Sequence, residues 1–148
     1  EEDMPKISAE ESLREANNAR NRASATQWEQ TALAKEAAHK KGQEELERLK
    51  QARNRLAQEN EIYTNFQLEL QRIGDSTPQT LFRGTLRTKF ETNLSELIQV
   101  TRTIQNNHEW NIALLDAEIS NRSIQQGDLL AAIGSAWNMV QSFLDSII

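Results

Sequence analysis

The chain of 148 residues has the length of one domain, carries a net charge of −5 and contains no cysteine. The missing cysteines exclude disulfides and thiolate metal sites, and the acidic balance argues against recognition of nucleic acid by charge. Only 37% of the residues are hydrophobic, Gly and Pro are few, and the mean hydropathy is −0.71. This composition favours long helices with a thin apolar seam over a thick globular core.

The N-terminal half predicts a short irregular start followed by one long helical arm. Residues 1–7 are expected to be irregular because Pro5 opposes an earlier helix, and Ser8 with Glu11 has the pattern of a capping box. The first arm then extends over residues 8–73. Its first half is rich in Ala and Asn and offers little apolar area, so we expect neighbouring chains to order it.

A cluster of turn-forming residues separates this arm from a second helical arm over residues 79–122. Gly74 is expected to supply the positive φ that commonly ends a helix, and Pro78 suits the first turn of the next helix. The residues between them are typical of turns and N-caps: Asp75, Ser76 and Thr77. The turn at 74–78 therefore predicts an all-α fold, an elongated antiparallel helical hairpin that is coiled-coil-like.

Apolar residues recur at three- and four-residue steps in both arms, which is the spacing of a heptad seam. The predicted hairpin seam consists of Leu49, Leu56, Phe66, Leu70, Phe90, Leu94, Leu97, Ile104 and Ile112. The expected neighbours across it are Phe66 and Leu70 with Leu86 and Phe90, and Leu49 or Leu56 with Ile104 or His108.

No motif in the chain carries catalytic chemistry. The sequence shows no Gly-rich phosphate loop and no nucleophile elbow, and acids such as Glu44 and Glu45 have the pattern of a solvated helix face. His108 falls on the apolar stripe, and packing is favoured over a metal or acid–base role because no second ligand stands at a suitable spacing. We therefore expect no enzyme activity, no metal site and no cofactor.

Residues 127–148 are the most apolar part of the chain and predict an appended C-terminal helix after a weak break at Gly127. Its stripe, interpreted as an assembly or membrane interface, consists of Leu129, Ile133, Trp137, Val140, Leu144 and Ile147. Three interpretations compete: a helix packed on the hairpin or on a neighbour, an interfacial membrane segment, and a disordered tail. The segment has no Lys or Arg, although an interfacial membrane helix usually carries these residues on its polar face. The membrane interpretation is therefore disfavoured. We expect it to pack first against protein, with Trp137 as an anchor and membrane contact only in the assembled state.

Four features carry a resemblance to a known family. They are the Gly-then-acidic run from Lys41 to Arg48, the turn of Gly74 with Ser76-Thr77-Pro78, the run Ile104, Asn107, Glu109 and Trp110, and the small-residue, apolar ending from Gly127. Together they resemble the small ejection protein, an internal virion protein of short-tailed bacteriophages. The resemblance implies a protein packaged near the portal and released through the tail, which then joins a conduit at the host envelope.

The expected function is therefore that of a structural virion protein in phage genome delivery. Its expected partners are copies of itself, as a homo-oligomer, and other virion proteins of the portal, tail or ejection machinery. Host-membrane contact through the C-terminal helix is a further option, and specific nucleic-acid recognition is not expected. The expected location is the virion, then the host cell envelope. Two alternatives remain: a pilus-tip or type IV secretion accessory protein, and a generic coiled-coil adaptor.

Overall fold

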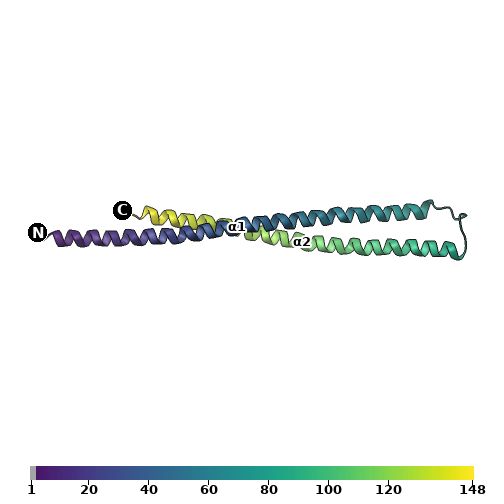
Figure 1. Ribbon diagram of the computed structural model, residues 1–148, viewed down its shortest axis with the longest axis horizontal. Helices are drawn as coiled ribbons and strands as arrows, with labels where there is room; N and C mark the ends of the chain where they lie inside the picture. Colours follow the sequence, from purple (N-terminus) through teal and green to yellow (C-terminus); the bar gives the residue numbers. More distant parts are fainter. Residues whose placement is uncertain (1–2) are drawn as a thin grey trace. The chain divides into compact units, whose positions relative to one another are not determined.

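The computed structural model describes the backbone of residues 3–148 and the side chains of residues 8–148. It contains two helices, α1 (Asp3–Ser76) and α2 (Thr85–Asp145), joined by a connection over residues 77–84 (Figure 1). The helices pack against each other as an antiparallel hairpin, and the described backbone contains no strand. The predicted all-α helical hairpin is confirmed.

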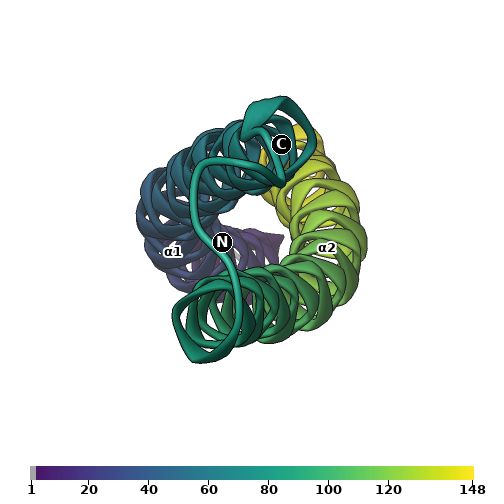
Figure 2. The ribbon, with the colours of Figure 1, turned by 90° about the vertical axis from the view of Figure 1, so that its right-hand side faces the viewer.

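The chain divides into two compact units, and each unit contains a segment of both helices. Unit 1 consists of Glu1–Glu45 and Arg122–Ile148, and unit 2 consists of Leu46–Asn121. In unit 1 the beginning of α1 packs with the end of α2. Unit 2 contains the connection, which Figure 2 shows end-on as it crosses from the last turn of α1 to the first turn of α2.

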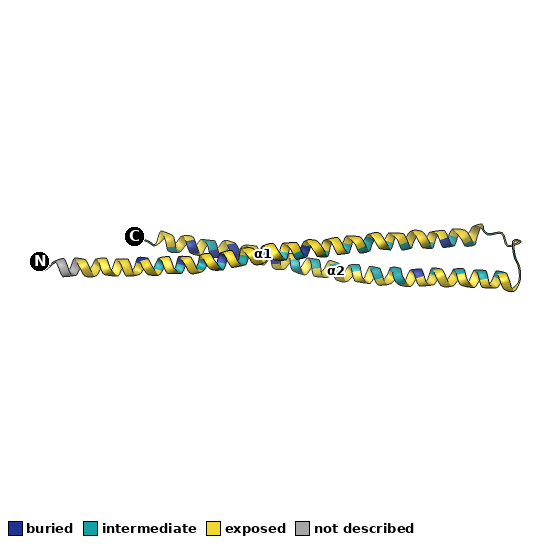
Figure 3. Ribbon diagram, viewed as in Figure 1, coloured by how far each residue is buried: buried dark blue, intermediate teal, exposed yellow. Residues whose placement is uncertain are grey.

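Buried and half-buried residues recur along both helices between stretches of exposed ones (Figure 3). In unit 2, a series on α1 follows alternating three- and four-residue steps and continues to Thr77 in the connection: Leu46, Leu49, Arg53, Leu56, Asn60, Tyr63, Gln67, Leu70, Gly74 and Thr77. On α2 the corresponding series is Phe90, Leu94, Ile98, Thr101, Gln105, His108, Ile112, Leu115 and Ile119. The seam is therefore a heptad seam in which polar residues hold several places.

The helix α1 begins earlier than predicted. The segment 1–7 was expected to be irregular, but the helix begins at Asp3, and residues 1 and 2 lie outside the described part of the chain. Pro5 stands in the first turn, where backbone N–H groups have no intrahelical partner, so it removes no helical hydrogen bond.

The turn lies later than the predicted 74–78, because Gly74 is helical and does not end α1. Among the described residues, the positive φ belongs to Gly84, at 66°. A Cβ at Gly74 would stand 2.6 Å from Leu94 Cδ2, so this glycine allows the two helices to approach closely. Gly84 instead begins α2: its carbonyl accepts a hydrogen bond from the N–H of Thr88 at 3.1 Å.

The hydroxyls predicted to cap the second helix end the first one instead. Ser76 Oγ donates to the carbonyl of Arg72 and Thr77 Oγ1 donates to that of Ile73, each at 2.6 Å. These bonds satisfy carbonyls that have no partner at the end of a helix. Pro78 lies in the connection and not in the first turn of α2.

The helix α2 continues through Gly127 to Asp145 without a boundary. The predicted arm 79–122 and the predicted C-terminal helix 127–148 therefore belong to one helix, which begins at Thr85. A glycine inside a helix costs only about 1 kcal/mol relative to Ala. The buried Gln126 and the half-buried Leu129 hold the helix against α1 on both sides of this position.

Candidate assembly surfaces

In unit 1 the apolar end of α2 packs on the Ala-rich beginning of α1. Ala25 and Ala32 are 4% and 0% exposed on α1, while Ile133, Ala136 and Val140 are 8%, 1% and 7% exposed on α2. Small side chains let two helices approach closely, and larger aliphatic ones fill the space beside them. From Asn18 onward the C-terminal segment of the same chain is the partner of this arm, which the sequence interpretation did not expect, whereas residues 8–17 are all exposed and their ordering by neighbouring chains stays a prediction.

Two asparagines of α1 hold the backbone beyond the last turn of α2. Asn18, which is buried, accepts a hydrogen bond from the N–H of Ile148 and donates one to its carbonyl, both at 3.1 Å. Asn21 Nδ2 donates to the carbonyl of Ser146 at 3.3 Å. The side-chain amide of Asn18 therefore pairs with both backbone groups of one residue.

Some residues of the predicted stripe of the C-terminal segment lie in the seam between α1 and α2, and others lie at the edge of this seam. The buried or half-buried members of the stripe are Leu129, Ile133, Trp137, Val140 and Ile147, whereas Leu144 is 46% exposed. Trp137 lies at the edge, where its Nε1–H donates to Glu36 Oε1 at 2.7 Å. Ala136 and Phe143 hold places in the seam that the sequence interpretation missed. The role of Trp137 as an anchor for other chains stays a prediction.

Gly42 has a specific role in the seam of unit 1. Gln126 is 8% exposed and donates from Nε2 to the carbonyl of His39 at 2.7 Å. A Cβ at Gly42 would stand 2.7 Å from Gln126 Cδ. The missing side chain at Gly42 therefore makes room for a buried hydrogen bond between the helices.

This arrangement predicts a coupling between Gly42 and Gln126. Gly42→Ala raises helix propensity by about 1 kcal/mol but displaces a buried amide whose lost hydrogen bond costs about 1–3 kcal/mol. We expect the substitution to stabilise the chain only in a Gln126→Ala background, with a coupling of about 1–2 kcal/mol. Urea denaturation of the four variants, followed by circular dichroism, measures it.

Gly134→Ala is the matched control, because a Cβ there would meet nothing within 4 Å. It should stabilise the chain equally in both backgrounds. A Gly42→Ala variant that is stabilised to the same degree with and without Gln126 would contradict the coupling.

Polar and aromatic contacts set the register in unit 2. Arg53 Nε donates to Asp116 Oδ1 at 3.0 Å, and the rings of Tyr63 and His108 meet edge to face with centroids 5.4 Å apart. His108 therefore lies in the seam, but its neighbour is Tyr63 and not Leu56, which lies two turns earlier. The expected pairing of Leu49 or Leu56 with Ile104 or His108 is wrong for this reason. The expected pairing of Phe66 and Leu70 with Leu86 and Phe90 is also wrong, because the bond between Thr64 and Gln105 places Phe66 level with Thr103.

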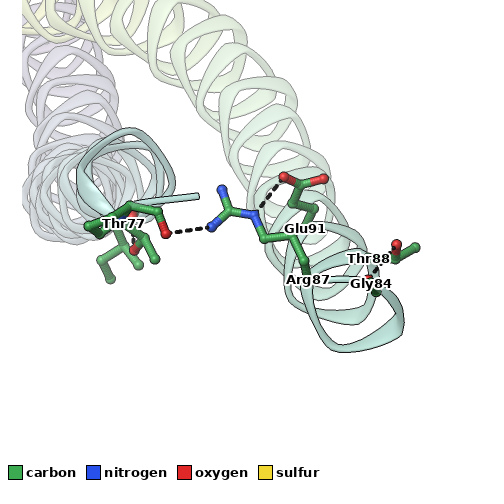
Figure 4. A network of polar contacts seen from close by, with 7 residues as sticks. Thr77, Gly84, Arg87, Thr88 and Glu91 are labelled. Carbon is green, nitrogen blue, oxygen red and sulfur yellow. Dashed lines mark hydrogen bonds and ion pairs between the residues drawn. The ribbon is translucent and has the colours of Figure 1, made fainter. Parts of the chain in front are cut away.

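Arg87 ties the start of α2 to the connection, a role that the sequence interpretation missed. Its Nε donates to Glu91 Oε1 at 2.9 Å and its Nη1 donates to the carbonyl of Pro78 at 3.3 Å (Figure 4). The guanidinium also lies 5.3 Å and 5.4 Å from the ring centroids of Phe82 and Phe90. Two arginines, Arg83 and Arg87, lie between these phenylalanines in the sequence, and nothing in the local sequence distinguishes the one that makes the contacts.

Three residues of the predicted hairpin seam lie beside it: the exposed Phe66 and Leu97, and the half-buried Ile104, whose next residue, Gln105, holds the seam position. The buried or half-buried members are Leu49, Leu56, Leu70, Phe90, Leu94, Ile104 and Ile112. Phe66 and Leu97 are each 48% exposed, and the next residues in the chain, Gln67 and Ile98, are the half-buried ones. Phe66 and Leu97 therefore belong to an exposed surface beside the seam.

Within residues 3–148, no group of three His, Cys, Asp or Glu side chains is arranged to hold a metal ion. No helix in this part of the chain has the length and hydropathy that crossing a bilayer needs. Comparison with protein-family models, curated proteins and solved structures finds no match to this chain.

Proposed function

We propose that this chain is a non-enzymatic structural subunit that acts by assembling with copies of itself and with other proteins. The distribution of its apolar side chains carries the proposal. Among residues 8–148, seventeen large apolar side chains are exposed, whereas seven apolar residues are buried and three of those are alanines. A hairpin that exposes more large apolar side chains than it buries gains stability when protein covers them.

The biological setting that we propose is the internal ejection machinery of a short-tailed bacteriophage, which the sequence resemblance supports. The chain is carried in the virion with portal, tail and other ejection proteins, and it leaves through the tail. With copies and partners it then forms part of a conduit that delivers the genome across the host envelope. The end of α2 packs with protein first and meets the host membrane only in the assembled state.

Purified virions test this setting. Quantitative mass spectrometry should find the chain in full particles and a loss of about tenfold or more from particles that have released their genome, with the major capsid protein as the retained control. A chain that is missing from full particles, or that stays in emptied ones, contradicts the proposal. Mating-pair genes beside its gene, in place of portal and tail genes, would favour the pilus-tip or secretion alternative.

A further inference from the structure

Six apolar residues of unit 2 lie beside the seam. On α1, Ile62, Phe66 and Ile73 are 65%, 48% and 47% exposed. On α2, Leu97 and Val100 are 48% and 57% exposed and Ile104 is half-buried. We call these residues the lateral apolar face: Ile62, Phe66, Ile73, Leu97, Val100 and Ile104. Both rows follow steps of three, four or seven residues, so each is continuous along its helix.

The two rows lie on the same flank of the hairpin. Phe66 and Ile73 each come one residue before a seam residue of α1, as Leu97 and Ile104 do on α2. In an antiparallel helix pair, the positions that precede the seam on both helices share one flank, and the positions that follow it share the other. The apolar rows therefore form one surface.

The opposite flank is polar and carries the hydrogen bonds between the helices. Thr64 follows the seam residue Tyr63, and its hydroxyl accepts a hydrogen bond from Gln105 Nε2. Asp116 also follows a seam residue, and its carboxylate accepts the bond from Arg53. Polar contacts thus close one flank of unit 2, while the other flank stays apolar and uncovered.

A hollow on α2 lies level with a protruding side chain on α1. The hollow has a volume of about 430 Å³ and is lined by Glu96, Gln99, Val100, Thr103 and Ile104. The bond between Thr64 and Gln105 sets the register, so Phe66, two residues after Thr64, is level with Thr103, two residues before Gln105. The exposed ring of Phe66 and this shallow, open hollow, which residues of α2 alone line, therefore stand at the same height on one molecule.

We propose that a second copy of this chain covers the lateral apolar face, with the two hairpins side by side and their connections at the same end. A twofold axis along the hairpin then places α1 of each copy on α2 of the other. Because Phe66 and the hollow are level, one rotation brings each Phe66 to the height of the hollow on the other copy, as an isologous interface requires. This partner assignment rests on the proposed assembly function and specifies its first contact.

Charge and area fit the same arrangement. The rotation brings Arg72, whose side chain is 77% exposed and pairs with Glu69 of its own helix at 3.9 Å, level with Glu96 of the other copy at the rim of the face. Six side chains of this size, about half exposed, present on the order of 500 Å² of apolar surface. With the polar rim this approaches the ~800 Å² that each partner buries in a standard interface.

Sedimentation velocity of the full chain tests the proposal. The chain should be a dimer at micromolar concentration, and Phe66→Glu should raise the dissociation constant by about 100-fold or more. Leu68→Glu is the matched control, because Leu68 is 55% exposed on the same helix but outside the face. Circular dichroism checks that both variants keep their helices. A monomeric chain, or equal weakening by both substitutions, would overturn the proposal.

Cross-linking tests the geometry, since the chain has no cysteine of its own. An equal mixture of Arg72→Cys and Glu96→Cys chains should yield a covalent dimer with a short bismaleimide. Either variant alone, or Gln71→Cys mixed with Glu96→Cys, should yield at least about fivefold less. A product from Arg72→Cys alone would show a different arrangement and overturn the one proposed. The experiment on purified virions is independent of these tests. The proposed dimer can therefore be contradicted while the proposed ejection function is supported.

Discussion

Ile98→Asp is expected to destabilise unit 2 by about 2–4 kcal/mol, whereas Leu97→Asp should cost less than about 1 kcal/mol. Ile98 is half-buried in the seam, near the level of the buried Leu70 on α1. A carboxylate there loses hydration among apolar side chains. At Leu97, which is 48% exposed on the lateral apolar face, a carboxylate keeps its water.

Positions 97 and 98 lie in the same helix, so both substitutions by Asp change the helix propensity by a similar amount. The difference between their free energies of unfolding therefore reports on burial. Urea denaturation of the chain diluted below the dissociation constant of the proposed dimer gives the free energy of unfolding of the monomer, and hydrogen exchange shows whether the loss lies in unit 2. If Leu97→Asp were the more destabilising variant, the seam would follow the pattern first expected from the sequence.

The hairpin could be predicted because its signal is repeated many times along the chain. Apolar residues at three- and four-residue steps over both arms predict two helices that share a seam, even when single positions are assigned wrongly. The turn signals also fell in the correct region. The position of the turn within that region depended on contacts across the seam, which the local sequence does not contain.

Gly74 and Gly84 show this limit directly. Each is a glycine with hydroxyl residues nearby, and either could end or begin a helix by local rules. The approach of Leu94 makes Gly74 a packing position, and the positive φ then belongs to Gly84. A contact between residues twenty apart in the chain decides which glycine makes the turn.

Leu97 was misplaced because the seam shifts locally and because polar residues hold some of its places. Phe90, Leu94 and Ile98 follow two successive four-residue steps, which interrupt the heptad pattern near the turn. Farther along the hairpin, Gln67 and Gln105 are half-buried in the seam. A search for apolar residues passes over them and selects exposed neighbours such as Phe66.

The partnership in unit 1 could have been found by counting outward from the turn. In an antiparallel hairpin, the predicted first arm of residues 8–73 is longer than the predicted second arm of residues 79–122. The unmatched part of the first arm must therefore face the residues that follow the second arm in the chain. The Ala-rich part of α1 and the apolar end of α2 differ in side-chain volume, and their packing is complementary for that reason. Taken alone, the first segment offers little apolar area and the second offers an apolar stripe with no partner.

Ala32→Asp tests this partnership and is expected to cost about 3–5 kcal/mol, enough to separate the two segments of unit 1. Ala32 is completely buried, and the bond between Trp137 and Glu36 places the equally buried Ala136 close to its level. A carboxylate at this position is forced between two helices that approach closely.

Ala34→Asp is the matched control, since Ala34 lies two residues away on the exposed side of α1 and loses the same helix propensity, about 0.7 kcal/mol. Hydrogen exchange with mass spectrometry should show a loss of protection of about 100-fold or more in residues 18–45 and 122–145 of the Ala32→Asp chain only. Amides of unit 2 serve as the internal reference in both variants. Equal protection in the two variants would show that the end of α2 does not hold this arm, and neighbouring chains would again be needed to order it.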